Sequence, residues 1–210
     1  MDLTTYLLFV PVALISICSP GPATMLAISN SMNYGVRRVH YSSLGNIIGQ
    51  FIVASLAMMG VGALLKTSEF LFDIVKVVGA VYLIYLGVQQ WRNKSKLNMN
   101  TEKSASVTSN SKIALKGLIL ALSNPKDIFF FTALLPQFIN PDSGLWQQFA
   151  ILIFSFLLFS YISLMTWASV AYKAKGWLTE ESRMSWFNKL TGGVFFILGI
   201  GMLKMKRNLT

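Results

Sequence analysis

Apolar stretches long enough to cross a membrane recur along the whole chain, and they constrain the fold more than any other feature. A helix that crosses the roughly 30 Å hydrocarbon core of a bilayer needs about 20 mostly apolar residues. Barrel strands would instead be short and alternating. The sequence therefore predicts an all-α polytopic membrane protein of six transmembrane helices in a single domain over residues 1–210. The predicted segments are Thr4 to Met32, Tyr41 to Leu65, Phe70 to Trp91, Ile113 to Phe138, Leu145 to Tyr172 and Phe187 to Leu203.

The composition agrees with this class and excludes others. Only 12% of the residues are charged, whereas soluble domains carry about 25%. The net charge of +10 comes from Lys and Arg residues that lie mainly between the apolar segments, which favours anionic lipid headgroups over nucleic acid as partner. The single cysteine, Cys18, is expected to be a small buried hydrophobic side chain. With one Cys and one His, the chain is predicted to hold no metal and no cofactor.

Basic residues between the segments predict the orientation in the membrane. Loops on the cytoplasmic side carry an excess of Lys and Arg. Three alternate loops are basic and are predicted to be cytoplasmic, which places both termini outside, although the tail Lys204, Lys206 and Arg207 argues against it. The basic loops hold Arg37 and Arg38, then Arg92, Lys94, Lys96, Lys103, Lys112 and Lys116, then Lys173, Lys175, Arg183 and Lys189, while the opposite loops hold only Lys66.

The two halves of the chain resemble each other. Ser19-Pro20-Gly21-Pro22 has a counterpart in Ser123-Asn124-Pro125-Lys126, and residues 76–82 resemble residues 189–195. Three helices are an odd number, so the second copy must enter the membrane from the opposite side. The sequence predicts a 3+3 inverted repeat, as in many secondary transporters. The repeats would cover about residues 1–92 and 112–210, joined by a polar cytoplasmic loop over about 93–111.

Proline interrupts the first segment. Pro20 and Pro22 lack an N–H and clash with the preceding turn, and Gly21 adds conformational freedom. Backbone without helical partners is tolerated in a bilayer beside protein or a water-filled cavity. The amides near Ala23 and Thr24, at the positive end of a new helix, suit a carboxylate. The alternative interpretation is a proline kink that binds nothing.

The second interruption, at Asn124-Pro125-Lys126-Asp127, places two ionisable residues in an apolar segment. Such residues are expensive at the bilayer centre. A break in the helix would let Lys126 and Asp127 face one cavity, with Lys126 on a substrate carboxylate and Asp127 on an ammonium group or a coupling proton. In the alternative interpretation the helix begins later and both residues reach the interface.

Other polar residues along the chain have structural or functional interpretations. Asn46 and Gln50, one turn apart, either line a pathway or hydrogen-bond across helices. Asp73 and Lys76 are expected to pair at the outer interface. His40 is expected to be solvated in a basic loop, so Ser/His/Asp catalysis has no support and the chain is not predicted to be an enzyme.

Taken together, these motifs resemble the LysE/RhtB family of amino-acid exporters. The resemblance rests on residues 19–22, 34–38, 45–49, 79–87 and 124–126, and on Pro136-Gln137-Phe138. It implies efflux of amino acids across the bacterial inner membrane, driven by the proton gradient. Some members carry an acidic residue at the position of Gln50. A role of that acid in binding substrate or protons is therefore not assigned to Gln50 in this chain.

Two functions follow as hypotheses. The first is a secondary exporter of amino acids by proton antiport, and the second is a gated channel or pore without coupling. A neutral amino acid is favoured because few acidic residues are available, and a homodimer is an option. The predicted substrate-binding residues are Ser19, Pro20, Gly21, Pro22, Ala23, Thr24, Asn46, Gln50, Asn124, Pro125 and Lys126, with Asp127 as the proton-coupling candidate.

Overall fold

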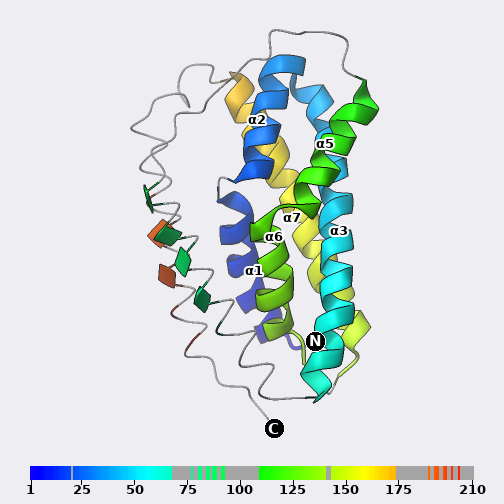
Figure 1. The fold of residues 1–210 in the computed structure, drawn as a ribbon, viewed down its shortest axis with the longest axis vertical. Helices are drawn as coiled ribbons and strands as arrows, with labels where there is room; N and C mark the ends of the chain where they lie inside the picture. Colours follow the sequence, from blue (N-terminus) through cyan, green and yellow to red (C-terminus); the bar gives the residue numbers. More distant parts are fainter. Residues whose placement is uncertain are drawn as a thin grey trace.

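The structure is a computed structural model. It describes residues 1–19, 21–67, 109–140 and 143–173, and scattered helical positions between 77 and 92 and between 189 and 203. The described residues are all helical or connecting, with no strand among them, which confirms the all-α class (Figure 1). The elements are α1 (Leu3–Cys18), α2 (Pro22–Tyr34), α3 (Val36–Thr67), α5 (Asn110–Leu122), α6 (Pro125–Phe129), the π-helix η1 (Phe130–Leu134), the 3-10 helix η2 (Leu135–Phe138) and α7 (Leu145–Lys173).

Two of the helices, α3 and α7, run uninterrupted along the length of the molecule. With 32 and 29 residues, they extend about 48 and 44 Å, enough to cross a bilayer. Both contain a window apolar enough for a membrane span. They run in opposite directions, α3 downwards and α7 upwards in the view of Figure 1.

The start of α3 differs from the prediction. The helix begins at Val36 rather than near Tyr41, so Arg37, Arg38 and His40 lie on its first turns and not in a loop. The reason is Gly35, whose φ of +81° turns the chain within one residue between α2 and α3. His40 is exposed, as predicted, and its Nδ1 is hydrogen-bonded to the Tyr161 hydroxyl.

Two bent helix pairs are also long and apolar enough to cross a membrane if each pair is taken as one span. The pair α1 and α2 bends by 53°, and the pair of Asn110–Leu122 with Pro125–Phe138 bends by 49°. Because α1 has 16 residues and α2 has 13, the first break falls about 24 Å from one end and 20 Å from the other. Figure 1 shows both breaks at mid-height, with the two pairs running in opposite directions. The predicted segments Phe70 to Trp91 and Phe187 to Leu203 lie mostly outside the described residues, as do Asp73 and Lys76.

Glycines bring α3 and α5 into close contact. A Cβ on Gly45 would lie 1.9 Å from the Ala114 carbonyl oxygen, and one on Gly117 would lie 2.0 Å from the Ser42 carbonyl oxygen. No other residue type fits at either position, because real Cβ contacts are far longer. Small residues at helix interfaces are typical of packing in membranes.

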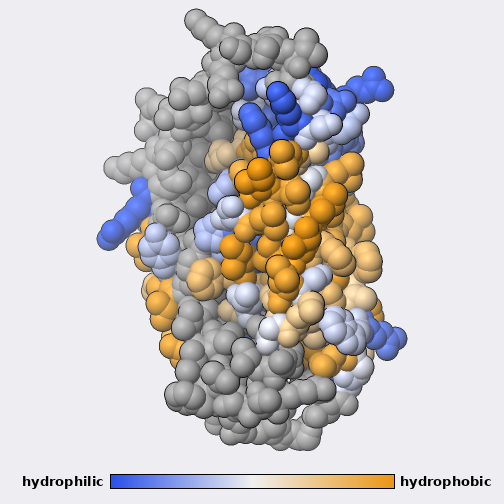
Figure 2. All heavy atoms as spheres, turned by 45° about the vertical axis from the view of Figure 1, so that its right-hand side comes forward, coloured by the Kyte–Doolittle hydropathy of each residue, from blue (hydrophilic) through white to orange (hydrophobic). Residues whose placement is uncertain are grey.

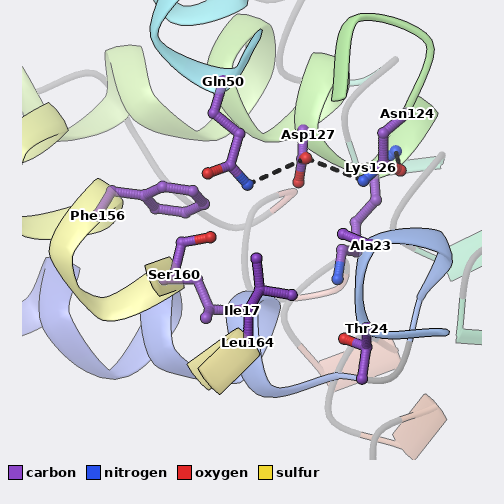
Figure 3. A pocket seen from close by; sticks show the side chains of 10 residues that line it. All are labelled: Ile17, Ala23, Thr24, Gln50, Asn124, Lys126, Asp127, Phe156, Ser160 and Leu164. Atoms are coloured by element: carbon purple, nitrogen blue, oxygen red, sulfur yellow. Dashed lines mark hydrogen bonds between the residues drawn. The ribbon is translucent and has the colours of Figure 1, made fainter. Parts of the chain in front are cut away.

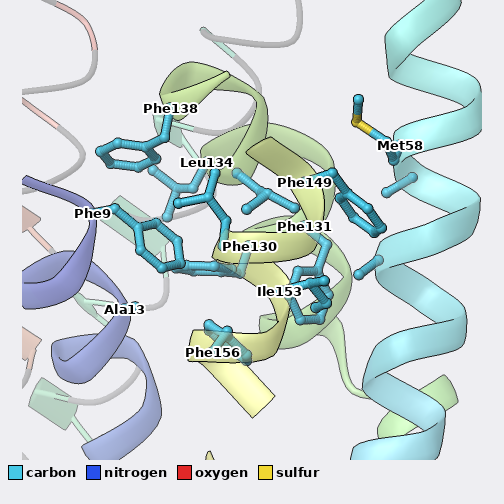
Figure 4. Close-up of a cluster of buried hydrophobic side chains, with 14 of the residues drawn as sticks. Phe9, Ala13, Met58, Phe130, Phe131, Leu134, Phe138, Phe149, Ile153 and Phe156 are labelled. Atoms are coloured by element: carbon cyan, nitrogen blue, oxygen red, sulfur yellow. The ribbon is translucent and has the colours of Figure 1, made fainter. Parts of the chain in front are cut away.

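Below the two breaks, a large apolar cluster that includes six phenylalanines fills the interior (Figure 4). The ring centroids of Phe130 and Phe156 are 4.6 Å apart, those of Phe131 and Phe156 are 4.9 Å apart, and those of Phe9 and Phe138 are 5.4 Å apart. Above the breaks, the second apolar cluster has smaller members, namely Ala27, Val39, Leu164 and Ala168. Among the described residues, the core therefore has one cluster rich in aromatic side chains and a second cluster that is aliphatic.

Many large apolar side chains of the described helices are exposed, among them Leu56, Met59 and Phe154. In Figure 2 such residues form a broad apolar zone across the described part of the face, with hydrophilic residues above it. Cys18 is exposed as well, so the prediction that it is buried is wrong. The buried face of α1 consists of Phe9, Ala13, Ser16 and Ile17, and the 100° advance from Ile17 to the next residue turns Cys18 outwards.

We expect Gly117→Ala to destabilise the protein, because the added methyl group would overlap the Ser42 carbonyl oxygen and push α5 away from α3. Overpacking of this kind costs about 1–3 kcal/mol, which should lower the midpoint of thermal unfolding in detergent by several degrees. The matched control is Gly60→Ala, because a Cβ at Gly60 meets no atom within 4 Å. Equal midpoints for the two variants would contradict the close contact.

Candidate functional site

The two helix breaks contact each other through Lys126. Its ammonium nitrogen Nζ donates hydrogen bonds to the carbonyl oxygens of Ser16 at 2.9 Å and Ser19 at 3.1 Å. In a continuous helix the Ser16 carbonyl would accept from the N–H of residue 20, but residue 20 is proline and has none. Lys126 therefore replaces the donor that the proline motif removes.

The start of α6 is built by the Asn-Pro-Lys-Asp sequence itself. Asn124 is the N-cap, and its Oδ1 accepts from the Lys126 backbone N–H at 3.2 Å. Pro125 occupies the first helical position, where a missing N–H does no harm. The Asn124 Nδ2 donates to the Asp127 Oδ2 at 2.9 Å, and an acid in the first turn suits the positive end of the helix.

Gln50 connects α3 to this carboxylate. Its Nε2 donates to the Asp127 Oδ2 at 3.1 Å, so the same carboxylate oxygen accepts from two amides. Asp127 is 2% exposed and Gln50 is 3% exposed. The other amide atom of Gln50, Oε1, is buried and has no hydrogen-bond partner among the described residues. A buried polar atom without a partner is costly, so Gln50 is poised to accept a hydrogen bond from a ligand.

The start of α2 leaves backbone amides available. Gly21 is the N-cap and has no side chain to accept from them, and the first N–H groups of a helix have no partner within it. Ala23 and Thr24 both border the same cavity as Lys126 and Asp127. This helix start is therefore a suitable anion site next to a lysine ammonium group.

These groups surround one small cavity at the level of the breaks (Figure 3). Its volume of about 20 Å³ suffices for roughly one water molecule, so the cavity is too small for an amino acid in this conformation. Ser160 adds a hydroxyl, while Ile17, Phe156 and Leu164 add apolar walls. The lining residues are Ile17, Ala23, Thr24, Gln50, Asn124, Lys126, Asp127, Phe156, Ser160 and Leu164.

The structure thus brings six of the predicted site residues to this cavity: Ala23, Thr24, Gln50, Asn124, Lys126 and Asp127. Ser19 and Gly21 adjoin it through Lys126, since a Cβ on Gly21 would lie 3.2 Å from the lysine Nζ. The two prolines Pro22 and Pro125 are exposed and line a separate groove of about 420 Å³. Pro20 lies outside the described residues.

Asn46 lies apart from the cavity, one turn before Gln50 on α3. It is 2% exposed, and neither Nδ2 nor Oδ1 has a hydrogen-bond partner among the described residues. The α7 residues Phe156, Ser160 and Leu164 were missed by sequence reasoning, because nothing in a continuous apolar helix marks the face that meets a site. Ser16 could have been found from the sequence. It precedes Pro20 by four residues, so the proline removes the helical donor to its carbonyl.

The described residues contain no group of three or more His, Cys, Asp or Glu side chains that could hold a metal ion. Helices long and apolar enough to cross a membrane, together with a cavity lined by charged groups, are typical of membrane transport proteins. A family model described as LysE type translocator matches residues 14–206. The chain therefore belongs to the LysE family of translocators.

Relatives agree with this family. An uncharacterized membrane protein of Vibrio cholerae is 34% identical over 207 residues, covering 97% of each chain. A protein of Salmonella typhi named homoserine/homoserine lactone efflux protein is 33% identical over 181 residues, covering 86% of this chain and 87% of its own. The protein of the same name in Salmonella typhimurium is 32% identical over the same length. No solved structure matches the chain.

We expect Asn124→Ala to destabilise the protein by about 1–3 kcal/mol, because it removes the cap of α6 and one of the two donors to Asp127. The matched control is Ser109→Ala, which removes the exposed cap of α5, where the Ser109 Oγ accepts from the Lys112 N–H. Thermal unfolding in detergent measures both. A loss for Asn124→Ala no larger than that for Ser109→Ala would show that the buried cap has no special role.

Proposed function

We propose that this chain is a secondary transporter that exports amino acids across the bacterial inner membrane, with the cargo bound at the cavity between the two helix breaks. The observation that carries this proposal is the contact of Lys126 with the end of α1 at mid-height of the molecule. It puts a cation, a buried carboxylate and uncapped backbone amides around one space. Buried charges are expensive in a membrane and are found there mainly for function.

The cavity suits a zwitterion. Lys126 and the amides of Ala23 and Thr24 offer donors to a carboxylate, and Asp127 supplies negative charge on the other side. The unpartnered Oε1 of Gln50 and the hydroxyl of Ser160 suit an uncharged, hydrogen-bonding side chain. The Salmonella relatives are named for homoserine and its lactone, and homoserine is an amino acid with such a side chain. We therefore propose a small neutral amino acid with a hydroxyl group as cargo.

The proposal includes six spans in a 3+3 inverted repeat with both broken helices in equivalent places. Supporting it, the pair α1 and α2 runs opposite to the pair α5 and α6, and α3 runs opposite to α7 (Figure 1). The contacts agree with this symmetry, because α3 packs on α5 and α7 contacts α1, the helix that precedes the first break as α5 precedes the second. In such repeats the cargo site lies at the interface between the two copies, near the bilayer midplane.

The proposed orientation places the upper end of Figure 1 in the cytoplasm and both termini outside. Arg37 and Arg38 at the start of α3, Lys112 on α5 and Lys173 at the end of α7 gather at that end. Arg38 donates two hydrogen bonds to Asn110 Oδ1, which ties two basic helix ends together. The homodimer stays a prediction.

The two halves of the core fit export from the cytoplasmic side. Aromatic side chains pack the outer half below the cavity, whereas the inner half contains the buried polar residues Asn30, Ser31, Ser42, Ser43 and Asn46. The Nδ2 of Asn30 and both amide atoms of Asn46 have no hydrogen-bond partner among the described residues. This favours opening on that side, because water or cargo would satisfy them. Rocking of one repeat against the other would then expose the cavity to each side in turn.

Lys126→Ala should abolish export, because the cargo loses its positive partner and the Ser16 and Ser19 carbonyls lose their donor. Lys112→Ala, which removes an exposed lysine on the preceding helix of the same broken pair, should export normally. Efflux of labelled homoserine and threonine from cells, with membrane levels checked by immunoblot, measures both. Normal export by Lys126→Ala would remove Lys126 from the mechanism.

Asp127 is the proposed proton-coupling group, and a gated channel without coupling is the alternative function. Asp127→Asn keeps an oxygen that can accept from Gln50 and Asn124 but has no proton to release. In proteoliposomes, we expect a pH gradient to drive uphill movement of a labelled amino acid through the wild type, and Asp127→Asn to allow only downhill movement.

The control for this experiment is Asp2→Asn, which changes an exposed acid and should leave uphill movement intact. A wild type that carries the amino acid downhill but never uphill would favour the channel. Uphill movement by Asp127→Asn would exclude this residue as the coupling group.

A further inference from the structure

We infer that the carbonyl oxygens of Ser16 and Ser19 form the binding site for the cargo's ammonium group, and that Lys126 occupies this site in the empty protein as a tethered substitute. The inference rests on the proposed export of an amino acid and adds how the cargo is recognised. Lys126 then has two positions. It lies on the α1 carbonyls when the site is empty, and on the cargo carboxylate when the site is filled.

The carbonyl site follows from the proline motif. Proline at position 20 removes the helical donor of the Ser16 carbonyl, and the interruption of the helix leaves the Ser19 carbonyl free of its own. Both oxygens belong to the C-terminal end of α1, where the helix dipole is negative. They lie 2.9 and 3.1 Å from the Lys126 Nζ, which is ordinary geometry for an ammonium donor. Any primary ammonium group offers the same donors.

Gly21 gives the site its shape. A Cβ at this position would lie 3.2 Å from the Lys126 Nζ and 3.6 Å from its Cε. The missing side chain therefore leaves a recess into which the head of an ammonium group fits. A methyl group there would crowd the ammonium without changing any charge, and this makes Gly21 a useful test position.

Replacement of the Lys126 ammonium by the cargo ammonium would account for the small volume of the cavity. Its volume of about 20 Å³ holds roughly one water molecule, so no amino acid fits while Lys126 lies in the recess. If a cargo ammonium replaces the Nζ, the carbonyls remain satisfied and the released lysine becomes available to the cargo carboxylate. When the cargo leaves, the lysine returns, and no buried carbonyl is left without a donor.

The alternative is that Lys126 is a permanent structural link that never leaves the carbonyls. An exchangeable lysine and a permanent link predict different ligand binding when Lys126 is replaced by a neutral side chain. Lys126→Met has similar length but cannot donate, so it empties the recess. An ammonium ligand should then bind more tightly if the recess is its site, because it no longer competes with the lysine.

The experiment measures binding of three related probes to the purified full-length chain in nanodiscs by calorimetry. L-threonine has both charges, its methyl ester has only the ammonium group, and N-acetyl-L-threonine has only the carboxylate. We expect the ester to bind Lys126→Met about tenfold more tightly than the wild type, the effect of one hydrogen bond to a charged group. We also expect the wild type to prefer threonine over its ester and Lys126→Met to prefer the ester.

The double variant Gly21→Ala/Lys126→Met is the matched control, because it has the same charge as Lys126→Met but a filled recess. It should lose the gain in ester binding, which separates a local site from a general effect of removing a positive charge. If Lys126→Met is too unstable to purify, Lys126→Ala should instead gain thermal stability from millimolar ethylammonium and none from acetate.

Ester binding that is no tighter in Lys126→Met than in the wild type, or no stabilisation by ethylammonium, would overturn the inference. So would an equal gain in the double variant. Export by the wild type, measured after the same purified protein is reconstituted into proteoliposomes, separates a failure of this inference from a failure of the proposed function. If no amino acid is exported at all, the proposed function fails, whereas export without the ester effect leaves that function standing and removes only the carbonyl site.

Discussion

A lysine ammonium held by two backbone carbonyls at the level of the helix breaks is the contact on which the rest of the structure depends. Proline at position 20 leaves the Ser16 carbonyl without its helical donor, and in a bilayer such a group must find a partner in the protein. Lys126 has the complementary problem, because an ammonium group at this depth needs acceptors. Each satisfies the other. The two interrupted helices are therefore joined at their breaks by these hydrogen bonds.

Close packing between α3 and α5 positions the other charge. The glycine contacts at Gly45 and Gly117 bring the two helices together, and Gln50 follows on the same helix just past Gly49. The Gln50 amide then reaches Asp127 at the start of α6. Asn124 contributes twice, because it caps α6 and also donates to Asp127. A cation and an anion are thus fixed beside one cavity, each by neutral groups. The proposed function assigns the cation to the cargo and the anion to the proton.

Much of this architecture can be predicted from the sequence, because membrane segments are long and proline leaves few conformational options. The expectation that Lys126 and Asp127 face one cavity is met. The partner of Lys126 was not predictable, since which carbonyls it meets depends on how two distant segments pack. The same holds for Phe156 and Ser160 on α7, and for Cys18, whose outward orientation depends on where α1 places its buried face. The early start of α3 follows from one φ angle at Gly35, which composition does not reveal.

The most direct test of the central claim is a distance measurement in a lipid bilayer. Solid-state NMR dephasing between Lys Nζ labelled with ¹⁵N and Ser carbonyl carbons labelled with ¹³C reports whether the ammonium lies on the broken end of α1. The N···O distances of 2.9 and 3.1 Å place the carbonyl carbons roughly 4 Å from the nitrogen. The account predicts strong dephasing of one lysine signal in the empty protein and its loss in Lys126→Met. Absence of that dephasing, or its persistence in the variant, would contradict the account.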